Sequence, residues 1–273
     1  MTDAIELLQS WGLEVIIGET LNAEYHQFAG NDDTRARDMQ RFLDDDNIKA
    51  IIAARGGYGT VRIIDKLDFS RFVQNPKWLI GFSDITVLHA HIWANYGIQT
   101  IHGQMPVNVS DASATSLETL RKSLFGEEVK YETDVHQLNR IGNASGTLVG
   151  GNLSLLISIL ASVSDYNYDG KILLLEDVGE YLYSIDRMMR ALKRAGKLKN
   201  LAGLIIGGFT ESKDNDIPFG QNAEEIIAEV IGEYRYPVCF GFPAGHISDN
   251  RALILGRTVN LKVEQHKAYI DYL

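Results

Sequence analysis

The sequence predicts an α/β protein whose strands and helices alternate along two segments. Short apolar runs typical of buried strands alternate with stretches of helical periodicity, which indicates a mostly parallel sheet with helices on both faces. The pattern weakens at residues 126–146 and then resumes as a second αβ segment, so this stretch is a candidate linker. With 273 residues, of which 45% are hydrophobic, the chain can bury a sizeable core as one large domain or two small ones.

The elements of the first segment follow from periodicity. A helix is expected where apolar residues recur every three or four positions, and a strand where a short apolar run meets a turn residue such as glycine. On these grounds we expect a helix at 5–11, a strand at 13–17, a charged helix at 34–43, a strand at 48–54, a helix at 61–67, a strand at 78–82, a helix from residue 85 and a strand at 98–102.

The second segment has the same character. Its most apolar run, Lys171–Glu176, predicts a buried strand, and a helix with basic residues on its exposed face follows at 185–195. We further expect a helix opened by Gly150-Gly151-Asn152, strands at 204–206 and 238–240, and two short strands near 253–255 and 268–272.

Composition and charge argue against several classes of function. The net charge of −10 disfavours nucleic-acid and anionic-membrane partners, because both favour a basic surface. No apolar run reaches the length of a membrane span, and residues 1–6 contain no basic region typical of a signal peptide, so we expect a cytoplasmic location. The single cysteine, Cys239, lies in an apolar run and is expected to be a buried structural thiol.

The strongest functional signal is a serine in a sharp-turn context. The apolar run Trp78–Ile80 meets Gly81-Phe82-Ser83, and a helical pattern begins directly afterwards. A strand, a tight turn with serine and a helix form a nucleophile elbow, which raises the hydroxyl out of the sheet next to a helix N-terminus. The alternative is that Ser83 only caps the following helix, and the local sequence leaves both interpretations open.

A serine nucleophile needs a base, and the base needs an acid that orients it. Among the seven histidines, His246 follows a buried strand in a loop rich in glycine and proline, where α/β folds place catalytic groups. Glu176 ends the most apolar strand, where a carboxylate needs a partner or a polar cleft. The alternatives are a loop histidine bonded to a nearby carbonyl group, and a glutamate that caps a helix or pairs with Arg187.

Backbone N–H groups could stabilise an oxyanion at two turns. The amide of Asp84 directly follows the candidate nucleophile. The turn Arg55–Gly59 follows another strand and contains adjacent glycines, which let a backbone approach a ligand closely. The alternative for this turn is a phosphate loop, for which the signal is weak because neither Gly-x-Gly-x-x-Gly nor Gly-Lys-Ser/Thr is present.

Five sequence blocks occur in an order that resembles a known family. They are Arg55-Gly56-Gly57-Tyr58-Gly59, Ile80–Thr86, Gly150–Leu153, Leu175–Glu180 with Ile185-Asp186-Arg187, and Gly241–His246. Together they resemble the LD-carboxypeptidase family of serine peptidases, which comprises the muramoyltetrapeptide carboxypeptidases with the microcin C self-immunity peptidase as a relative. The resemblance spans nearly the whole chain, and five ordered blocks are far more specific than any one of them.

The resemblance implies a two-domain fold. An N-terminal αβ domain at residues 1–125 would carry the nucleophile, and a smaller C-terminal αβ domain at 147–273 would carry the acid and the histidine, with the active-site cleft between them. Members of the family usually begin with an extra apolar strand before the first helix, whereas this chain begins inside that helix. We therefore expect the N-terminal domain to lack the usual first strand.

The resemblance also implies a catalytic site. Ser83 matches the nucleophile, Glu176 the orienting acid and His246 the general base. The oxyanion hole would be formed by the backbone amides of Asp84 and Gly57. No metal or organic cofactor is implied.

The implied reaction is hydrolysis of an L,D peptide bond that releases terminal D-alanine from a murein tetrapeptide during cell-wall recycling. A carboxypeptidase must also bind the free carboxylate of its substrate, and Arg55 and Asn152 are the candidates for this contact. The alternatives are an immunity-type serine peptidase that cleaves a peptide-nucleotide antibiotic, and an inactive muropeptide-binding homologue. An exposed apolar helix face could support a homodimer.

Overall fold

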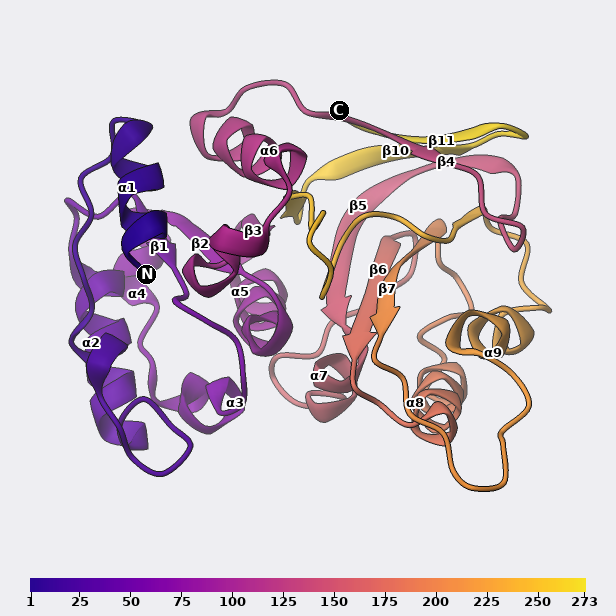
Figure 1. Cartoon of the computed structure of the whole chain (residues 1–273), viewed down its shortest axis with the longest axis horizontal. Coiled ribbons are helices and arrows are strands. Elements are labelled where there is room, and N and C mark those ends of the chain that lie inside the picture. The colour runs from indigo at the N-terminus through magenta and orange to yellow at the C-terminus, as the bar shows by residue number, and fades with distance from the viewer.

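The computed structural model describes residues 1–273 and contains two β-sheets with helices packed against them (Figure 1). The first sheet has four strands in the order β1-β2-β3-β9. These strands are β1 (Ala50–Ile52), β2 (Trp78–Gly81), β3 (Thr100–His102) and β9 (Leu253–Leu255). β1, β2 and β3 are parallel, as the sequence predicts, whereas β9 runs antiparallel to β3. A strand from the end of the chain therefore completes the sheet of the N-terminal half.

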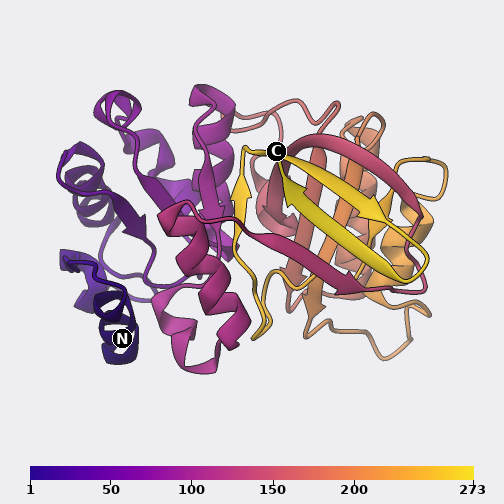
Figure 2. The ribbon, with the colours of Figure 1, turned by 90° about the horizontal axis from the view of Figure 1, so that it is seen from above.

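The second sheet has seven strands in the order β4-β11-β10-β5-β6-β7-β8. Their bounds are β4 (Lys130–Asp134), β5 (Gly142–Asn152), β6 (Ile172–Val178), β7 (Gly203–Thr210), β8 (Val238–Cys239), β10 (Thr258–Val263) and β11 (Lys267–Tyr272). β5 to β8 are parallel, whereas β4, β11 and β10 form antiparallel pairs and pass over the parallel strands in the view from above (Figure 2). The C-terminal half, which we expect to be the smaller domain, carries the larger sheet.

Helices surround the first sheet and cover one side of the second (Figure 1). Their bounds are α1 (Thr2–Ser10), α2 (Asp32–Asp44), α3 (Thr60–Ile63), α4 (Ser70–Gln74), α5 (Thr86–Tyr96), α6 (Ala114–Phe125), α7 (Leu153–Ser158), α8 (Leu182–Arg194) and α9 (Ala223–Val230), with 3-10 helices η1 (Glu19–Asn22), η2 (Ile64–Lys66), η3 (Ser83–Ile85) and η4 (Pro106–Asp111). α8 buries Ile185, Met189 and Leu192 and keeps its basic residues outside the core, as its periodicity predicts. None of the helices combines the length and the apolar composition needed to cross a lipid bilayer.

One apolar cluster joins the two halves of the chain. It contains 35 buried residues, among them Phe82, Val87 and Leu88 of the first half and Leu153 and Leu175 of the second. Burial of apolar surface is the main favourable contribution to folding, and loosely associated domains usually meet at more polar surfaces. The contact between the two halves is therefore part of the core of the protein.

Two segments differ from the prediction. Residues 13–17 form no strand, because this extended run pairs with no neighbour and leaves Ile16 and Ile17 about half exposed. Residues 126–146 supply β4 and the first residues of β5 rather than a linker. β4 alternates exposed and buried side chains, so its polar positions face water and make the strand resemble a loop in the sequence.

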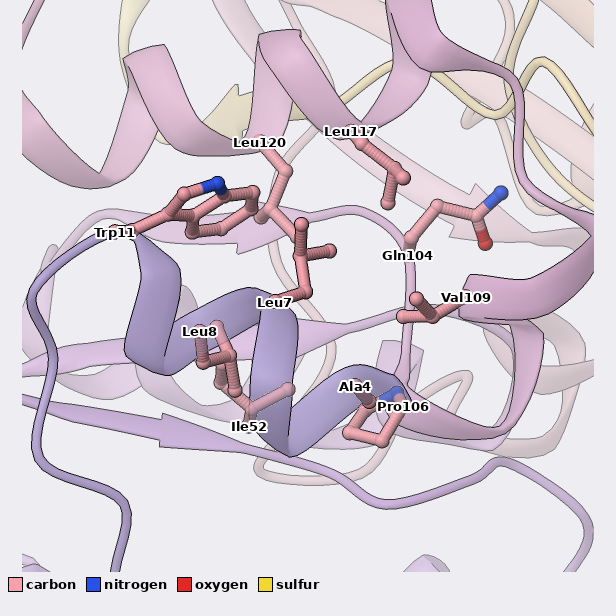
Figure 3. Close-up of a pocket in the computed structure, with 10 residues that line it drawn as sticks. All are labelled: Ala4, Leu7, Leu8, Trp11, Ile52, Gln104, Pro106, Val109, Leu117 and Leu120. Atoms are coloured by element: carbon pink, nitrogen blue, oxygen red, sulfur yellow. The ribbon is translucent and has the colours of Figure 1, made fainter. Parts of the chain in front are cut away.

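A narrow apolar pocket lies between α1 and α6 (Figure 3). Leu7 of α1 and Trp11, which directly follows α1, face Leu120 of α6 across it, and Gln104 is the one amide among its lining side chains. The pocket contains no candidate nucleophile or base, so it is separate from the candidate active site.

Candidate active site

Ser83 lies in a sharp turn between β2 and α5. β2 ends at Gly81, η3 begins at Ser83, and α5 continues from Thr86. The backbone of Ser83 has a φ of +63°, which residues other than glycine rarely adopt and which is typical of strained functional turns. A Cβ atom at Gly81 would lie 2.9 Å from Ile85 Cγ1, so the turn requires glycine at this position. The turn therefore has the form of a nucleophile elbow.

His246 and Glu176 meet Ser83 from the second half of the chain. His246, in the loop after β8, places Nε2 3.1 Å from Ser83 Oγ and Nδ1 2.7 Å from Glu176 Oε2. An ionised carboxylate can only accept, so the Nδ1–H group donates to Glu176 and Nε2 accepts from the serine hydroxyl. A Cβ atom at Gly245 would lie 2.5 Å from Glu176 Oε2, so glycine permits the close approach of the loop to the carboxylate.

Burial and charge act in opposite directions on His246. The exposed fraction of the side chain is 20% for His246 and 0% for Glu176. Burial lowers the pKa of His246, but the hydrogen bond and the charge of Glu176, together with the charges of Asp177 and Glu211, outweigh it and raise the pKa above its ordinary value. The surroundings therefore favour the imidazolium form, which a general base acquires when it takes a proton.

The glycine-rich turn lies directly against the serine. A Cβ atom at Gly56 would lie 2.9 Å from Ser83 Cβ and 3.1 Å from Ser83 Oγ. Asp84 Oδ2 accepts hydrogen bonds from the backbone N–H (2.8 Å) and the hydroxyl group (2.6 Å) of Thr60, so a buried carboxylate ties the two turns together. The N–H groups of Gly57 and Asp84 donate to no protein group, which leaves both free to bind an oxyanion.

The side chain of Asn152 is buried and hydrogen-bonded within the protein. Its Oδ1 atom accepts from the N–H of Leu155 and thereby caps α7. Its Nδ2 group donates to Asp177 Oδ1 at 2.9 Å, and its backbone N–H donates to Thr86 Oγ1 at 3.0 Å. Asn152 thus joins the two halves of the chain beside the nucleophile turn, and its contact with substrate stays a prediction.

Asp177 supports the same junction from β6. Its carboxylate accepts from Asn152 Nδ2 and from the backbone N–H groups of Ser154 and Val178. Burial raises the pKa of Asp177 to about 6, although the hydrogen bonds oppose this shift. The sequence alone does not identify Asp177 or Thr86 as part of this junction, because their role depends on which strands become neighbours.

Arg55, by contrast, is exposed and forms no ion pair or hydrogen bond through its guanidinium group. Its Nη2 atom lies 3.9 Å from the position of a Cβ atom at Gly57, beside the glycine-rich turn. A positive charge with no partner is therefore available at the rim of the site.

The fold and the site define a serine-hydrolase arrangement, in which one hydrogen bond joins serine to histidine and a second joins histidine to a buried acid. The comparisons with known proteins then give the family. Residues 1–103 match the LD-carboxypeptidase N-terminal domain, and residues 145–261 match the LD-carboxypeptidase C-terminal domain. The chain belongs to the LD-carboxypeptidase family of serine-type peptidases, as the resemblance of its sequence blocks predicts.

Individual relatives cover almost the whole chain. A probable murein peptide carboxypeptidase of Bacillus subtilis is 35% identical over 275 residues, which span 98% of this chain and 86% of the relative. The crystal structure of a muramoyltetrapeptide carboxypeptidase from Oxalobacter formigenes matches with a TM-score of 0.89 at 29% identity, covering 99% of this chain and 93% of that chain. The microcin C7 self-immunity protein MccF has a TM-score of 0.86 at 21% identity, covering 98% and 89%, and shares the fold.

Proposed function

We propose that this protein is a serine carboxypeptidase that hydrolyses the L,D peptide bond of a murein tetrapeptide and releases its terminal D-alanine in the cytoplasm. The observation that carries the proposal is the pair of hydrogen bonds that connects Ser83 Oγ to His246 and His246 to Glu176. Ser83 comes from a strained turn and Glu176 from a buried strand. The names of its relatives support the choice of substrate.

The mechanism follows from the positions of these groups. His246 Nε2 takes the hydroxyl proton while Ser83 Oγ attacks the carbonyl carbon that precedes D-alanine, and Glu176 stabilises the imidazolium that forms. The N–H groups of Gly57 and Asp84 bind the oxyanion. His246 then gives the proton to the departing amine, and D-alanine leaves. Water, deprotonated by the same imidazole, hydrolyses the acyl-enzyme and restores the serine hydroxyl.

Recognition of the carboxylate of D-alanine is assigned to Arg55. The guanidinium group is exposed and unpaired, and it lies beside the turn that would bind the oxyanion. The scissile carbonyl and the terminal carboxylate of the substrate are separated by one residue, so the two groups need binding partners that lie close together. Arg55 supplies the charge that a free carboxylate requires.

The test is release of D-alanine from purified murein tetrapeptide. We expect Ser83→Ala to abolish release and to leave the melting temperature nearly unchanged, since the hydroxyl group makes no hydrogen bond other than that to His246. Ser158→Ala is the matched control, because its hydroxyl is exposed and bonds only the Leu155 carbonyl group. Release by the Ser83→Ala variant at the wild-type rate would refute the mechanism.

Labelling with a fluorophosphonate probe separates the remaining alternatives. An activated serine reacts with the probe, whereas a homologue that only binds muropeptides does not. Labelling without D-alanine release would retain the serine peptidase and reject the tetrapeptide as its substrate. The homodimer expected from the sequence remains a prediction, which light scattering of the purified protein can test.

A further inference from the structure

A group of buried polar side chains lies beside the loop that carries His246 and is not used by the mechanism. His102 and Asn250 have an exposed fraction of 0%, and both ring nitrogens of His102 and the Nδ2 atom of Asn250 have no hydrogen-bond partner in the protein. Burying a polar group without a hydrogen-bond partner lowers the stability of a protein, and most buried polar groups are hydrogen-bonded. These two residues therefore need an explanation.

His102 is placed by the sheet next to the nucleophile strand. It ends β3 and is in register with Gly81, the last residue of β2, two positions before Ser83. The Phe82 ring has its centroid 5.8 Å from that of His102 and 4.9 Å from that of His246. His102 and His246 thus contact the same aromatic ring of the nucleophile turn.

Asn250 holds the loop that carries His246 by a hydrogen bond to its backbone. Its Oδ1 atom accepts a hydrogen bond of 2.9 Å from the backbone N–H of Gly245, the residue directly before His246. Gly245 lies against the carboxylate of Glu176, with room for no side chain. Any change in the position of Asn250 is therefore transmitted to the imidazole and to its hydrogen bond with Glu176.

His102 and Asn250 are neighbours, because His102 of β3 is in register with Leu253 of β9, three residues after Asn250, and the Asn250 side chain is among the groups that act on the imidazole. Burial, with smaller contributions from the charges of His89 and His246, lowers the pKa of His102 to about 3, although contact with the Asn250 side chain opposes the shift. His102 is consequently neutral at the pH values at which His246 titrates. It can support the loop without adding a positive charge beside the imidazolium.

We propose that His102 and Asn250 are positioning residues that hold the His246 loop at the correct distance from Ser83. This inference rests on the proposed function. His102 on β3, the strand next to the nucleophile strand, lies beside Asn250. Asn250 bonds the N–H of Gly245, and Gly245 directly precedes His246, which bonds both Glu176 and Ser83. Catalytic groups displaced by about 1 Å can lose a hundredfold in rate, so such support is a determinant of kcat.

The experiment compares His102→Leu, His102→Gln and Asn250→Ala in the full-length protein. We expect kcat for D-alanine release to fall roughly ten- to hundredfold in His102→Leu and in Asn250→Ala, with KM changed less than about threefold. His102→Gln keeps a polar group toward Asn250 and is expected to recover at least part of the loss. The double variant that combines His102→Leu with Asn250→Ala should lose no more than the worse single variant, because the two residues act through the same loop.

His91→Gln is the matched control. His91 is also a buried histidine, but its Nδ1 atom bonds Ser164 Oγ rather than a group of the nucleophile turn or the His246 loop. We expect His91→Gln to lower the melting temperature without a fall in kcat. Equal kcat values in wild type and in folded His102→Leu and Asn250→Ala proteins would overturn the positioning role, as would additive losses in the double variant.

The rate of fluorophosphonate labelling keeps this test separate from the substrate assignment. If wild type is labelled but releases no D-alanine, the tetrapeptide is rejected as substrate, and slower labelling of the folded His102→Leu variant still supports the positioning role. If wild type is not labelled, both the proposed function and this inference fail. If His102→Leu does not fold, the labelling rate of Asn250→Ala decides the outcome.

Discussion

Replacing Gly245 with alanine is expected to separate His246 from Glu176. The added Cβ atom would lie 2.5 Å from Glu176 Oε2 and 2.8 Å from its Cγ atom, distances at which one of the two groups must move. Overpacking of this kind typically costs about 1–3 kcal/mol. The backbone of Gly245 also has a φ of +101°, and a left-handed conformation costs a residue with a Cβ atom roughly 1–2 kcal/mol more. We therefore expect a loss of about 2–5 kcal/mol in stability.

Gly241 provides the matched control in the same loop. It has a φ of +70°, but a Cβ atom there would meet nothing within 4 Å. Gly241→Ala thus carries the backbone strain without the collision with Glu176. We expect kcat for D-alanine release to fall about a hundredfold in Gly245→Ala and to change little in Gly241→Ala. Urea unfolding curves and steady-state kinetics of both variants are the measurements, and equal kcat values in the two variants would refute the reasoning.

Two further predictions concern charge. Glu176→Gln is expected to lower kcat by roughly 10³–10⁴-fold, since a neutral amide no longer fixes the tautomer of His246 or stabilises the imidazolium. Because Glu176 raises the pKa of His246 against the effect of burial, the acid limb of the pH profile of kcat/KM should move to lower pH in this variant, and an unmoved limb would contradict the assignment. Arg55→Gln should raise KM for the tetrapeptide at least tenfold without slowing fluorophosphonate labelling, whereas Arg37→Gln, which replaces another exposed arginine, should change neither.

The sequence was sufficient for the parts of the site that depend on local pattern. Gly81 and Ser83 are two residues apart, so the turn between a buried strand and a helix could be inferred from its neighbours. Glu176 ends the apolar run of one strand and His246 follows another strand, so both are expected near the ends of strands even when the partner strands are unknown. The order of the five blocks then favoured one set of residues over the capping and surface alternatives.

Pairing between distant segments could not be predicted in the same way. Residues 13–17 have the composition of a strand but find no neighbour, and β4 has polar alternation that resembles a loop. β9 joins the sheet of the N-terminal half through β3, a pairing between segments about 150 residues apart. Asn152 illustrates the same limit, because only the position of Thr86 beside β5 shows that the backbone N–H of Asn152 bonds the half of the chain that carries Ser83.

The boundary between the two halves bears on how the site works. β9 lies in the first sheet, Asn152 bonds Thr86 beside the nucleophile turn, and one apolar cluster continues from α5 to α7 and β6. Opening this boundary by a hinge motion would break strand pairing and expose buried apolar surface, each at a cost of several kcal/mol. The hydrogen bonds of Ser83, His246 and Glu176 are therefore fixed by core packing rather than by closure on substrate. Substitutions that remove volume from this cluster, such as Leu153→Ala, should accordingly lower kcat as well as stability.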